Sequence, residues 1–190
     1  MGRWLCGLLL GLLPGLAPAL VPPGMPSLEL GTLDLDGYRD HAYHAPVPAQ
    51  HPDATTVNTP EARALIDSAQ VVAIDVMAAT ARPADGDVPA GFIPSKVRRH
   101  IPGSTWLPNV GYAELTPAVE RYYRDNLARL SGGDHARALL IYCIADCWLS
   151  WNAVHRAASW GYRRLYWYPE GSDGWAEAGL PLSEAVPVAP

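Results

Sequence analysis

The sequence contains few cysteines and no strongly basic stretch. Only three of its 190 residues are cysteine, at positions 6, 143 and 147. Lysine and arginine number 14 against 19 aspartate and glutamate residues, a formal net charge of −5, so the chain is a poor candidate for binding nucleic acid or an anionic membrane. No phosphate-binding glycine loop, internal repeat or convincing serine–histidine–aspartate order is present.

The first 19 residues have the pattern of an export signal. Arg3 precedes an apolar stretch over 4–16, and an Ala-Pro-Ala sequence at 17–19 offers a cleavage site. The stretch is short for a membrane-spanning helix, so we expect cleavage; a retained membrane anchor is the alternative. Cys6 would leave with this segment. Loss of Arg3 would leave 13 basic against 19 acidic residues, a net charge of −6.

The remaining chain, about 170 residues, is long enough for one domain with a hydrophobic core and too short for two large ones. Residues 20–54 are rich in proline, glycine and histidine, and we expect an extended strap on the domain surface. We interpret its histidines, His41, His44 and His51, as residues of a solvated loop in preference to ligands of a metal site. The domain is expected over 55–183, followed by a tail at 184–190.

Apolar runs alternate with helical patterns through the expected domain. Continuous apolar runs predict strands buried on both faces at 71–76, 138–142 and 165–168. Capping and proline signals predict helices that start at Thr59 and Thr116, and an apolar periodicity predicts a third over 150–160. This alternation predicts an α/β domain with a largely parallel sheet. Between these elements, 77–99 is expected to be an irregular lid or insertion and 171–175 a tight loop.

Cys143 and Cys147 bound a short loop between a predicted strand and a predicted helix. A cysteine between a strand end and a helix N-terminus is favoured as the thiolate, which is its reactive form. Export to an oxidising compartment favours a disulfide between the two. A ring of five residues would be only weakly stabilising by loop entropy, which favours a chemical role over a purely structural one.

Other polar residues gather near this loop. Asp75 ends a predicted strand, and chemistry in parallel sheets gathers at the carboxyl ends of strands. We interpret Asp75 as a structural carboxylate in preference to a general base. His100 is interpreted as hydrogen-bonding the turn that follows it in preference to donating a proton. Within the loop, Asp146 is expected to raise the thiol pKa, and Trp148 to line the mouth of the site.

Four motifs occur in order along the expected domain: Ile74–Asp75–Val76, His100–Ile101–Pro102–Gly103 with Leu107–Pro108, Tyr142–Cys143 entering a helix, and Gly161–Tyr162 to Tyr168 followed by Gly171, Gly174 and Trp175. Together they resemble the rhodanese-like (sulfurtransferase) domain over about residues 55–182. A fuller set resembles the exported rhodanese-like proteins of PQQ-dependent alcohol catabolism in bacteria, which are named for a cysteine–tryptophan motif. That set comprises Gly37–Tyr38–Arg39, the segments 106–112 and 147–153, and Trp167–Tyr168–Pro169.

The resemblance implies a three-layer α/β domain whose mostly parallel central sheet is flanked by helices. It implies that Cys143 is the persulfide-forming cysteine, cradled by backbone N–H groups of a loop that includes Ile144, Ala145, Asp146, Trp148, Leu149 and Ser150. The sequence departs from the family pattern in its second cysteine, Cys147, and in Trp148, which replaces a common arginine. Thiosulfate thereby lacks one partner, although Lys96, Arg98 and Arg99 could supply charge.

The resemblance favours an exported sulfurtransferase-type enzyme, periplasmic or secreted and free of the membrane once the signal is removed. Cys143 would be its nucleophile. Attack by Cys147 on a Cys143 persulfide would release sulfide and leave a disulfide. The expected partners are a small sulfur compound or protein thiol and a periplasmic PQQ-dependent dehydrogenase system. The alternatives are a thiol–disulfide redox protein and a non-enzymatic accessory or maturation factor, including a two-thiol Cu(I) carrier. No metal site or cofactor is assigned, and PQQ binding by this chain does not follow.

Overall fold

The computed structural model describes residues 33–34, 36–84, 90–93 and 96–190. The predicted export signal at 1–19 and the first part of the strap lie outside these residues. In the part of the chain that is described, no helix combines the length and apolar character needed to cross a membrane.

Five parallel strands form the central sheet in the order β1-β8-β7-β2-β6. Their bounds are β1 Thr55–Thr56, β2 Val72–Asp75, β6 Thr105–Trp106, β7 Leu139–Tyr142 and β8 Leu165–Tyr168. All four residues of the central strand β7 are buried. The apolar runs therefore mark strands covered on both faces, as predicted.

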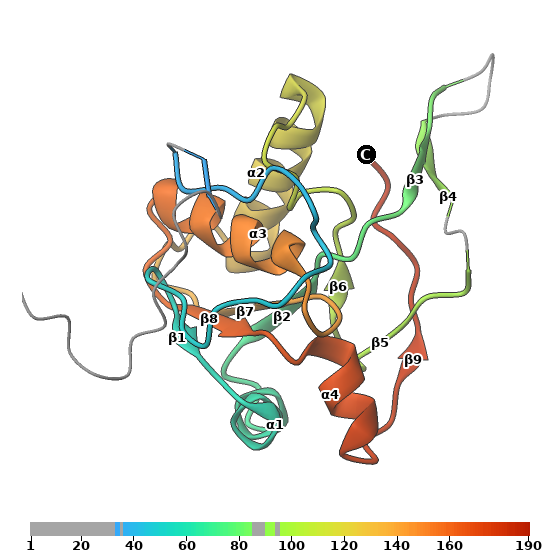
Figure 1. Cartoon of the computed structure of the whole chain (residues 1–190). Helices are drawn as coiled ribbons and strands as arrows, with labels where there is room; N and C mark the ends of the chain where they lie inside the picture. Colours follow the sequence, from blue (N-terminus) through green and yellow to red (C-terminus); the bar gives the residue numbers. More distant parts are fainter. Residues whose placement is uncertain (1–32, 35, 85–89, 94–95) are drawn as a thin grey trace, which may run out of the picture.

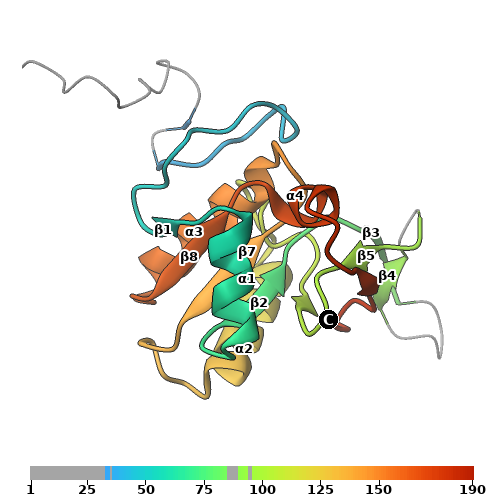
Figure 2. The same ribbon diagram turned by 90° about the horizontal axis from the view of Figure 1, so that it is seen from below.

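Helices cover both faces of this sheet, so the domain has three layers (Figures 1 and 2). Helices α2 (Pro117–Ser131) and α3 (Trp148–Ser159) pack on one face, and α1 (Thr59–Asp67) and α4 (Gly171–Glu177) on the other. In β7, Leu139 and Ile141 face the first pair, whereas Leu140 and Tyr142 face the second. Full burial of such a side chain contributes about 1.5–3 kcal/mol, so both cores hold the sheet in place.

Helices α1 and α2 begin close to their predicted capping residues. Helix α2 is capped by Thr116, as predicted, and ends at Gly132 in the left-handed conformation. Helix α1 is capped by Asn58 and not by Thr59. The Thr59 hydroxyl instead lies 2.6 Å from the Tyr168 hydroxyl, because a neighbouring strand places that group beside it.

Two segments are more ordered than the sequence predicts. The segment 77–99 contains an antiparallel hairpin and the start of a second antiparallel pair: β3 (Thr80–Arg82) with β4 (Gly91–Ile93), and β5 (Arg99–His100) with β9 (Ser183–Glu184). The predicted loop at 171–175 is the start of α4. Burial of Trp175 and a hydrogen bond from the Ser172 N–H to the Cys143 carbonyl hold this helix, and neither contact is visible in local sequence.

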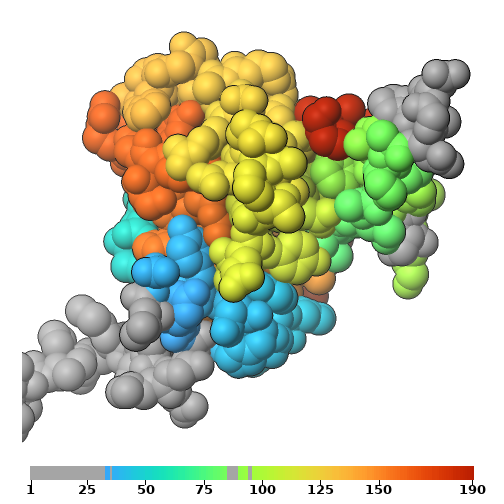
Figure 3. Space-filling view, turned by 90° about the horizontal axis from the view of Figure 1, so that it is seen from above, coloured from blue at the N-terminus to red at the C-terminus, as the bar shows by residue number. Residues whose placement is uncertain are grey.

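The described part of the strap runs along the sheet face that carries α3, blue in Figure 1. In the space-filling view it lies against the segment around Tyr112, whose ring contacts the ring of Tyr43 (Figure 3). The prediction that His51 lies in a solvated loop is wrong. Its side chain is buried against the rings of Trp151 and Trp167, and its neutral imidazole has a partner at each nitrogen.

Candidate active site

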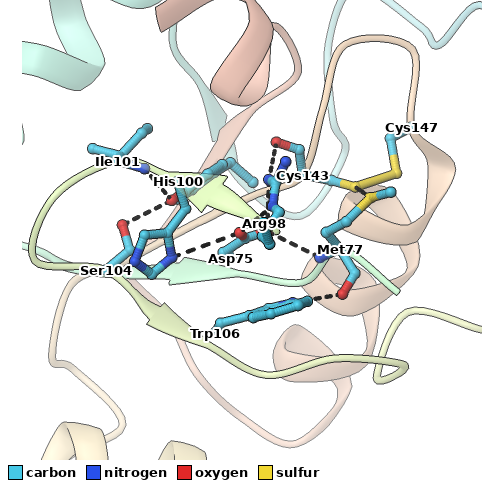
Figure 4. A network of polar contacts seen from close by, with 10 residues as sticks. Asp75, Met77, Arg98, His100, Ile101, Ser104, Trp106, Cys143 and Cys147 are labelled. Carbon is cyan, nitrogen blue, oxygen red and sulfur yellow. Dashed lines mark hydrogen bonds and ion pairs between the residues drawn. A yellow bond between two sulfur atoms is a disulfide. The ribbon is translucent and has the colours of Figure 1, made fainter. Parts of the chain in front are cut away.

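The cysteine loop begins at the carboxyl end of β7 beside the end of β2. The register of these strands places Asp75 opposite Tyr142, so the residues that follow them meet at one edge of the sheet. The Sγ atom of Cys143 consequently lies 3.6 Å from the Sδ atom of Met77 (Figure 4). Met77 was not predicted as a site residue. Its only sequence signal is its position two residues beyond a strand end.

Cys143 and Cys147 form a disulfide within this loop. Their Cα atoms lie 6.1 Å apart, inside the usual range of about 4.4–6.8 Å. Between them, Asp146 adopts a left-handed conformation with a φ of 52°, which aspartate tolerates better than most residues. Cys147 is the N-cap of α3, so the helix begins two residues earlier than predicted. Cys143 is fully buried, and Cys147 is 5% exposed.

Helix α4 holds the first half of the loop. The Ser172 N–H donates to the Cys143 carbonyl at 3.0 Å, and Asp173 accepts a hydrogen bond from the Ala145 N–H at 3.2 Å. Gly171 makes this approach possible: it has a φ of +56°, and a Cβ atom there would lie 2.4 Å from the Cys143 carbonyl oxygen. The first turn of α4 is thus fitted to the cysteine loop.

The strap holds the second half of the loop. The Ala45 N–H donates to the Asp146 carbonyl at 3.0 Å, and the Trp148 N–H donates to the Tyr43 carbonyl at 2.8 Å. Together they form an antiparallel bridge centred on Cys147. The N–H groups of residues 145 and 148 therefore already have partners, so only part of the expected backbone cradle remains available to a sulfur anion.

Asp75 lies beneath the loop as a fully buried carboxylate. Arg98 binds both of its oxygens, with Nε 2.9 Å from Oδ2 and a terminal nitrogen 3.1 Å from Oδ1. The Met77 N–H also donates to Oδ1, at 3.0 Å, and Arg98 reaches the Cys143 carbonyl at 3.5 Å. The carboxylate therefore holds the Arg98 cation and the Met77 backbone beside the cysteines.

His100 does not bind the turn that follows it. Its buried Nδ1 has no hydrogen-bond partner among the described residues and lies 3.7 Å from Asp75 Oδ2. Tyr142 holds the turn instead, because its hydroxyl accepts from the Ile101 N–H at 3.1 Å and donates to the Ser104 hydroxyl at 2.8 Å. Burial raises the pKa of Tyr142 far above its ordinary value, so this hydroxyl stays protonated.

Trp148 does not line the mouth of the site, contrary to the prediction. Its side chain is 1% exposed and packs on the ring of Trp151 at 5.3 Å between centroids. The Arg39 guanidinium lies 5.1 Å from the Trp148 ring centroid. Because α3 begins at Trp148, the side chain enters the core beneath the strap. The position that often carries an anion-binding arginine is thus a packing position here.

A cavity of about 240 Å³ adjoins the site through Met77. Three cationic residues, Lys96, Arg98 and Arg99, lie along its wall. Arg98 is paired with Asp75, and Arg99 donates to the Leu182 carbonyl at 2.8 Å, whereas the Lys96 side chain is exposed. Across the described ranges, no three histidine, cysteine, aspartate or glutamate side chains gather as a metal site.

The rhodanese-like domain family matches residues 58–178 of this chain. The chain belongs to that family. The match contains both cysteines, Asp75 and His100, so the site described above lies in a rhodanese-like domain. The expected three-layer fold with a parallel sheet is confirmed. No curated protein sequence matches the chain.

Several solved structures are similar to this rhodanese-like chain. A thiosulfate sulfurtransferase from Pseudomonas aeruginosa is 17% identical over 70% of this chain and 21% of its own, with a TM-score of 0.48. A polysulfide-sulfur transferase homodimer from Wolinella succinogenes is 18% identical over 69% of this chain and 79% of its own, with a TM-score of 0.43. Wild-type EanB is 21% identical over 70% of this chain and 28% of its own, with a TM-score of 0.46. This chain thus spans about a fifth of the Pseudomonas protein.

Proposed function

We propose that this rhodanese-like protein carries sulfur as a persulfide on Cys143 and releases it with Cys147 as the resolving thiol. The observation that carries the proposal is the Cys143–Cys147 disulfide at the carboxyl end of β7, where the loop enters α3. A thiol beside a second thiol, near the N-terminus of a helix, favours thiolate and disulfide chemistry. Membership in the rhodanese-like family supports sulfur as the transferred atom.

The cycle starts from the dithiol. The Cys143 thiolate attacks the terminal sulfur of a persulfide or polysulfide donor; a new S–S bond forms on Cys143, and the donor leaves as a thiolate. The Cys147 thiolate then attacks the Sγ atom of Cys143, forms the disulfide and expels the terminal sulfur as hydrosulfide. Two cysteine thiols are oxidised as the transferred sulfur is reduced. A small or protein dithiol reduces the disulfide and restores the starting state.

The charges around the site favour an anionic donor that does not have to be bound by an arginine. Lys96, Arg98 and Arg99 give the cavity beside Met77 a positive wall, which attracts anions. Both arginines are engaged by other groups, however, and position 148 carries a buried tryptophan. A persulfide or polysulfide reacts through its terminal sulfur, whereas thiosulfate also presents a sulfonate that must be bound. We therefore propose the former as donors and thiosulfate as a poor one.

Two single-cysteine variants test the cycle. With polysulfide, reduced Cys147→Ser should gain the mass of one sulfur atom on Cys143, and Cys143→Ser should gain none there. The wild type should release one hydrosulfide for each disulfide formed, and neither variant should do so. If Cys143→Ser gained sulfur and released hydrosulfide at the wild-type rate, the assignment of Cys143 as the persulfide-forming cysteine would be overturned.

A thiol–disulfide redox protein is the second candidate, because the same disulfide would serve it. It is favoured if a dithiol reduces the wild-type disulfide rapidly while Cys147→Ser accepts no sulfur from any donor. A non-enzymatic accessory role remains if neither reaction occurs.

We also propose that the protein is exported and serves PQQ-dependent alcohol catabolism. The export pattern at 1–19 and the cysteine–tryptophan resemblance support this placement. Sequencing the N-terminus of the protein from the native cell should show cleavage after Ala19. Deleting its gene should slow growth on an alcohol oxidised by a quinoprotein dehydrogenase and leave growth on a sugar unchanged. A retained leader would contradict export, and equal growth on both substrates would contradict the catabolic role.

A further inference from the structure

Three sulfur atoms from two distant parts of the sequence meet at the cysteine loop. The Met77 Sδ atom lies 3.6 Å from Cys143 Sγ, and Cys143 is joined to Cys147 (Figure 4). We infer that, once the disulfide is reduced, Cys143, Cys147 and Met77 bind one Cu(I) ion. This metal site goes beyond sulfur carriage, since it needs no sulfur donor and adds a ligand that persulfide chemistry does not require.

The ligand set matches a soft monovalent ion. Thiolate and thioether sulfur select Cu(I), whereas structural zinc sites use four cysteine, histidine or carboxylate ligands. Within the described part of the chain, no third residue of those types joins the two cysteines. A neutral thioether as third ligand also keeps the charge low, because two thiolates and Cu(I) sum to a single negative charge.

The spacing fits three-coordinate sulfur. With metal–sulfur bonds of about 2.3 Å, two ligands of a trigonal site lie about 4 Å apart. The Met77–Cys143 sulfur separation of 3.6 Å is already near this value. The Cys143 and Cys147 Cα atoms, 6.1 Å apart, allow their sulfurs to separate to a similar distance after reduction. Small side-chain movements therefore suffice to build the site.

The backbone of Met77 is held in place for this role. Its N–H donates to Asp75 at 3.0 Å, and its carbonyl accepts a hydrogen bond from the Trp106 indole at 2.7 Å. The cysteines are almost fully buried, while Met77 is partly exposed and lines the basic cavity. The two buried cysteines would shield the bound metal from water. Fixed ligands in an apolar shell strengthen metal binding.

The oxidation state of the loop would control binding. A dithiol reductant supplies two electrons, breaks the Cys143–Cys147 bond and leaves as its own disulfide. Cu(I) then displaces one proton from each thiol and binds without changing its oxidation state. The oxidised protein holds both cysteine sulfurs in a disulfide and has no thiolate to offer.

Anaerobic titration of the reduced protein with Cu(I) against a chromogenic Cu(I) chelator tests the site. The wild type should bind one Cu(I), and the oxidised protein none. Met77→Leu keeps the side-chain volume, and its affinity should fall about tenfold or more, because even outer-shell changes weaken metal sites by about 10–100-fold. The Cys143→Ser/Cys147→Ser double variant should lose binding.

X-ray absorption of the copper-loaded wild type provides a readout that needs no variant to fold. It should show three sulfur neighbours, and Met77→Leu should show two. Two sulfurs in the wild type, or equal affinity in Met77→Leu, would overturn the role of Met77. Wild-type affinity no greater than that of the double cysteine variant would overturn the site. Copper binding is measured without a sulfur donor and persulfide loading without copper, so failure of either proposal is seen separately.

Discussion

Reduction of the Cys143–Cys147 disulfide should weaken the fold only slightly. The bond closes a ring of five residues, counted from Cys143 to Cys147. Cross-linking a ring of that size removes about 7 cal/mol/K of chain entropy from the unfolded state, or about 2 kcal/mol at 25 °C. The buried core around the loop, which includes Trp148, Trp151 and Trp167, does not depend on the bond. The reduced protein should therefore stay folded and available for thiol chemistry.

Urea unfolding followed by tryptophan fluorescence, with and without a reductant, measures this difference. The free energy of unfolding should fall by about 2 kcal/mol, with little change in the dependence on urea. A Cys143→Ala/Cys147→Ala variant should match the reduced wild type and should not respond to reductant. Unfolding on reduction, or a loss above about 5 kcal/mol, would refute the ring argument and show that the bond is mainly structural.

Three further predictions concern residues that support the site. Arg98→Met leaves the Asp75 carboxylate buried without its cation, so the free energy of unfolding should fall by about 3–5 kcal/mol. Adding Asp75→Asn should recover part of this loss. A double variant as unstable as Arg98→Met would contradict the pairing. Gly103→Ala should lower the free energy of unfolding by about 1–2 kcal/mol for its positive φ alone, because no atom lies within 4 Å of a Cβ atom there. Gly171→Ala should lower it by about 1–3 kcal/mol more, because its Cβ atom would meet the Cys143 carbonyl; equal losses in urea unfolding would argue against the close approach. Burial lowers the pKa of His51 from its ordinary value of 6.5 to about 4, so the unfolded chain binds this proton more readily. The neutral His51 therefore makes its full contribution to the free energy of unfolding above about pH 6.5, and this contribution falls by about 3 kcal/mol as the pH drops from 6.5 to 4. His51→Gln should lose less stability than the wild type between pH 7 and pH 4, and an identical pH profile would contradict this.

Much of the architecture could be predicted from local patterns. The runs at 71–76, 138–142 and 165–168 are apolar because a strand in a parallel sheet is covered on both faces, and each became a strand. Thr116 and Gly132 mark the ends of α2 for equally local reasons, namely a side-chain cap and a left-handed turn. Where two partners compete, local patterns fail. Thr59 had the signature of a cap but bonds to groups from another strand and its following turn.

The position of the cysteine loop, between a strand and a helix of an α/β domain, follows from the sequence by itself. Hydrophobic burial and helix capping act over a few residues, so their pattern survives in the chain. Only the tertiary structure decided that Met77 meets Cys143, that Trp148 is buried beneath the strap, and that Tyr142 holds the turn assigned to His100. These contacts depend on which strands are neighbours and in what register. Such long-range pairings join residues far apart in the chain and leave no periodic signal in it.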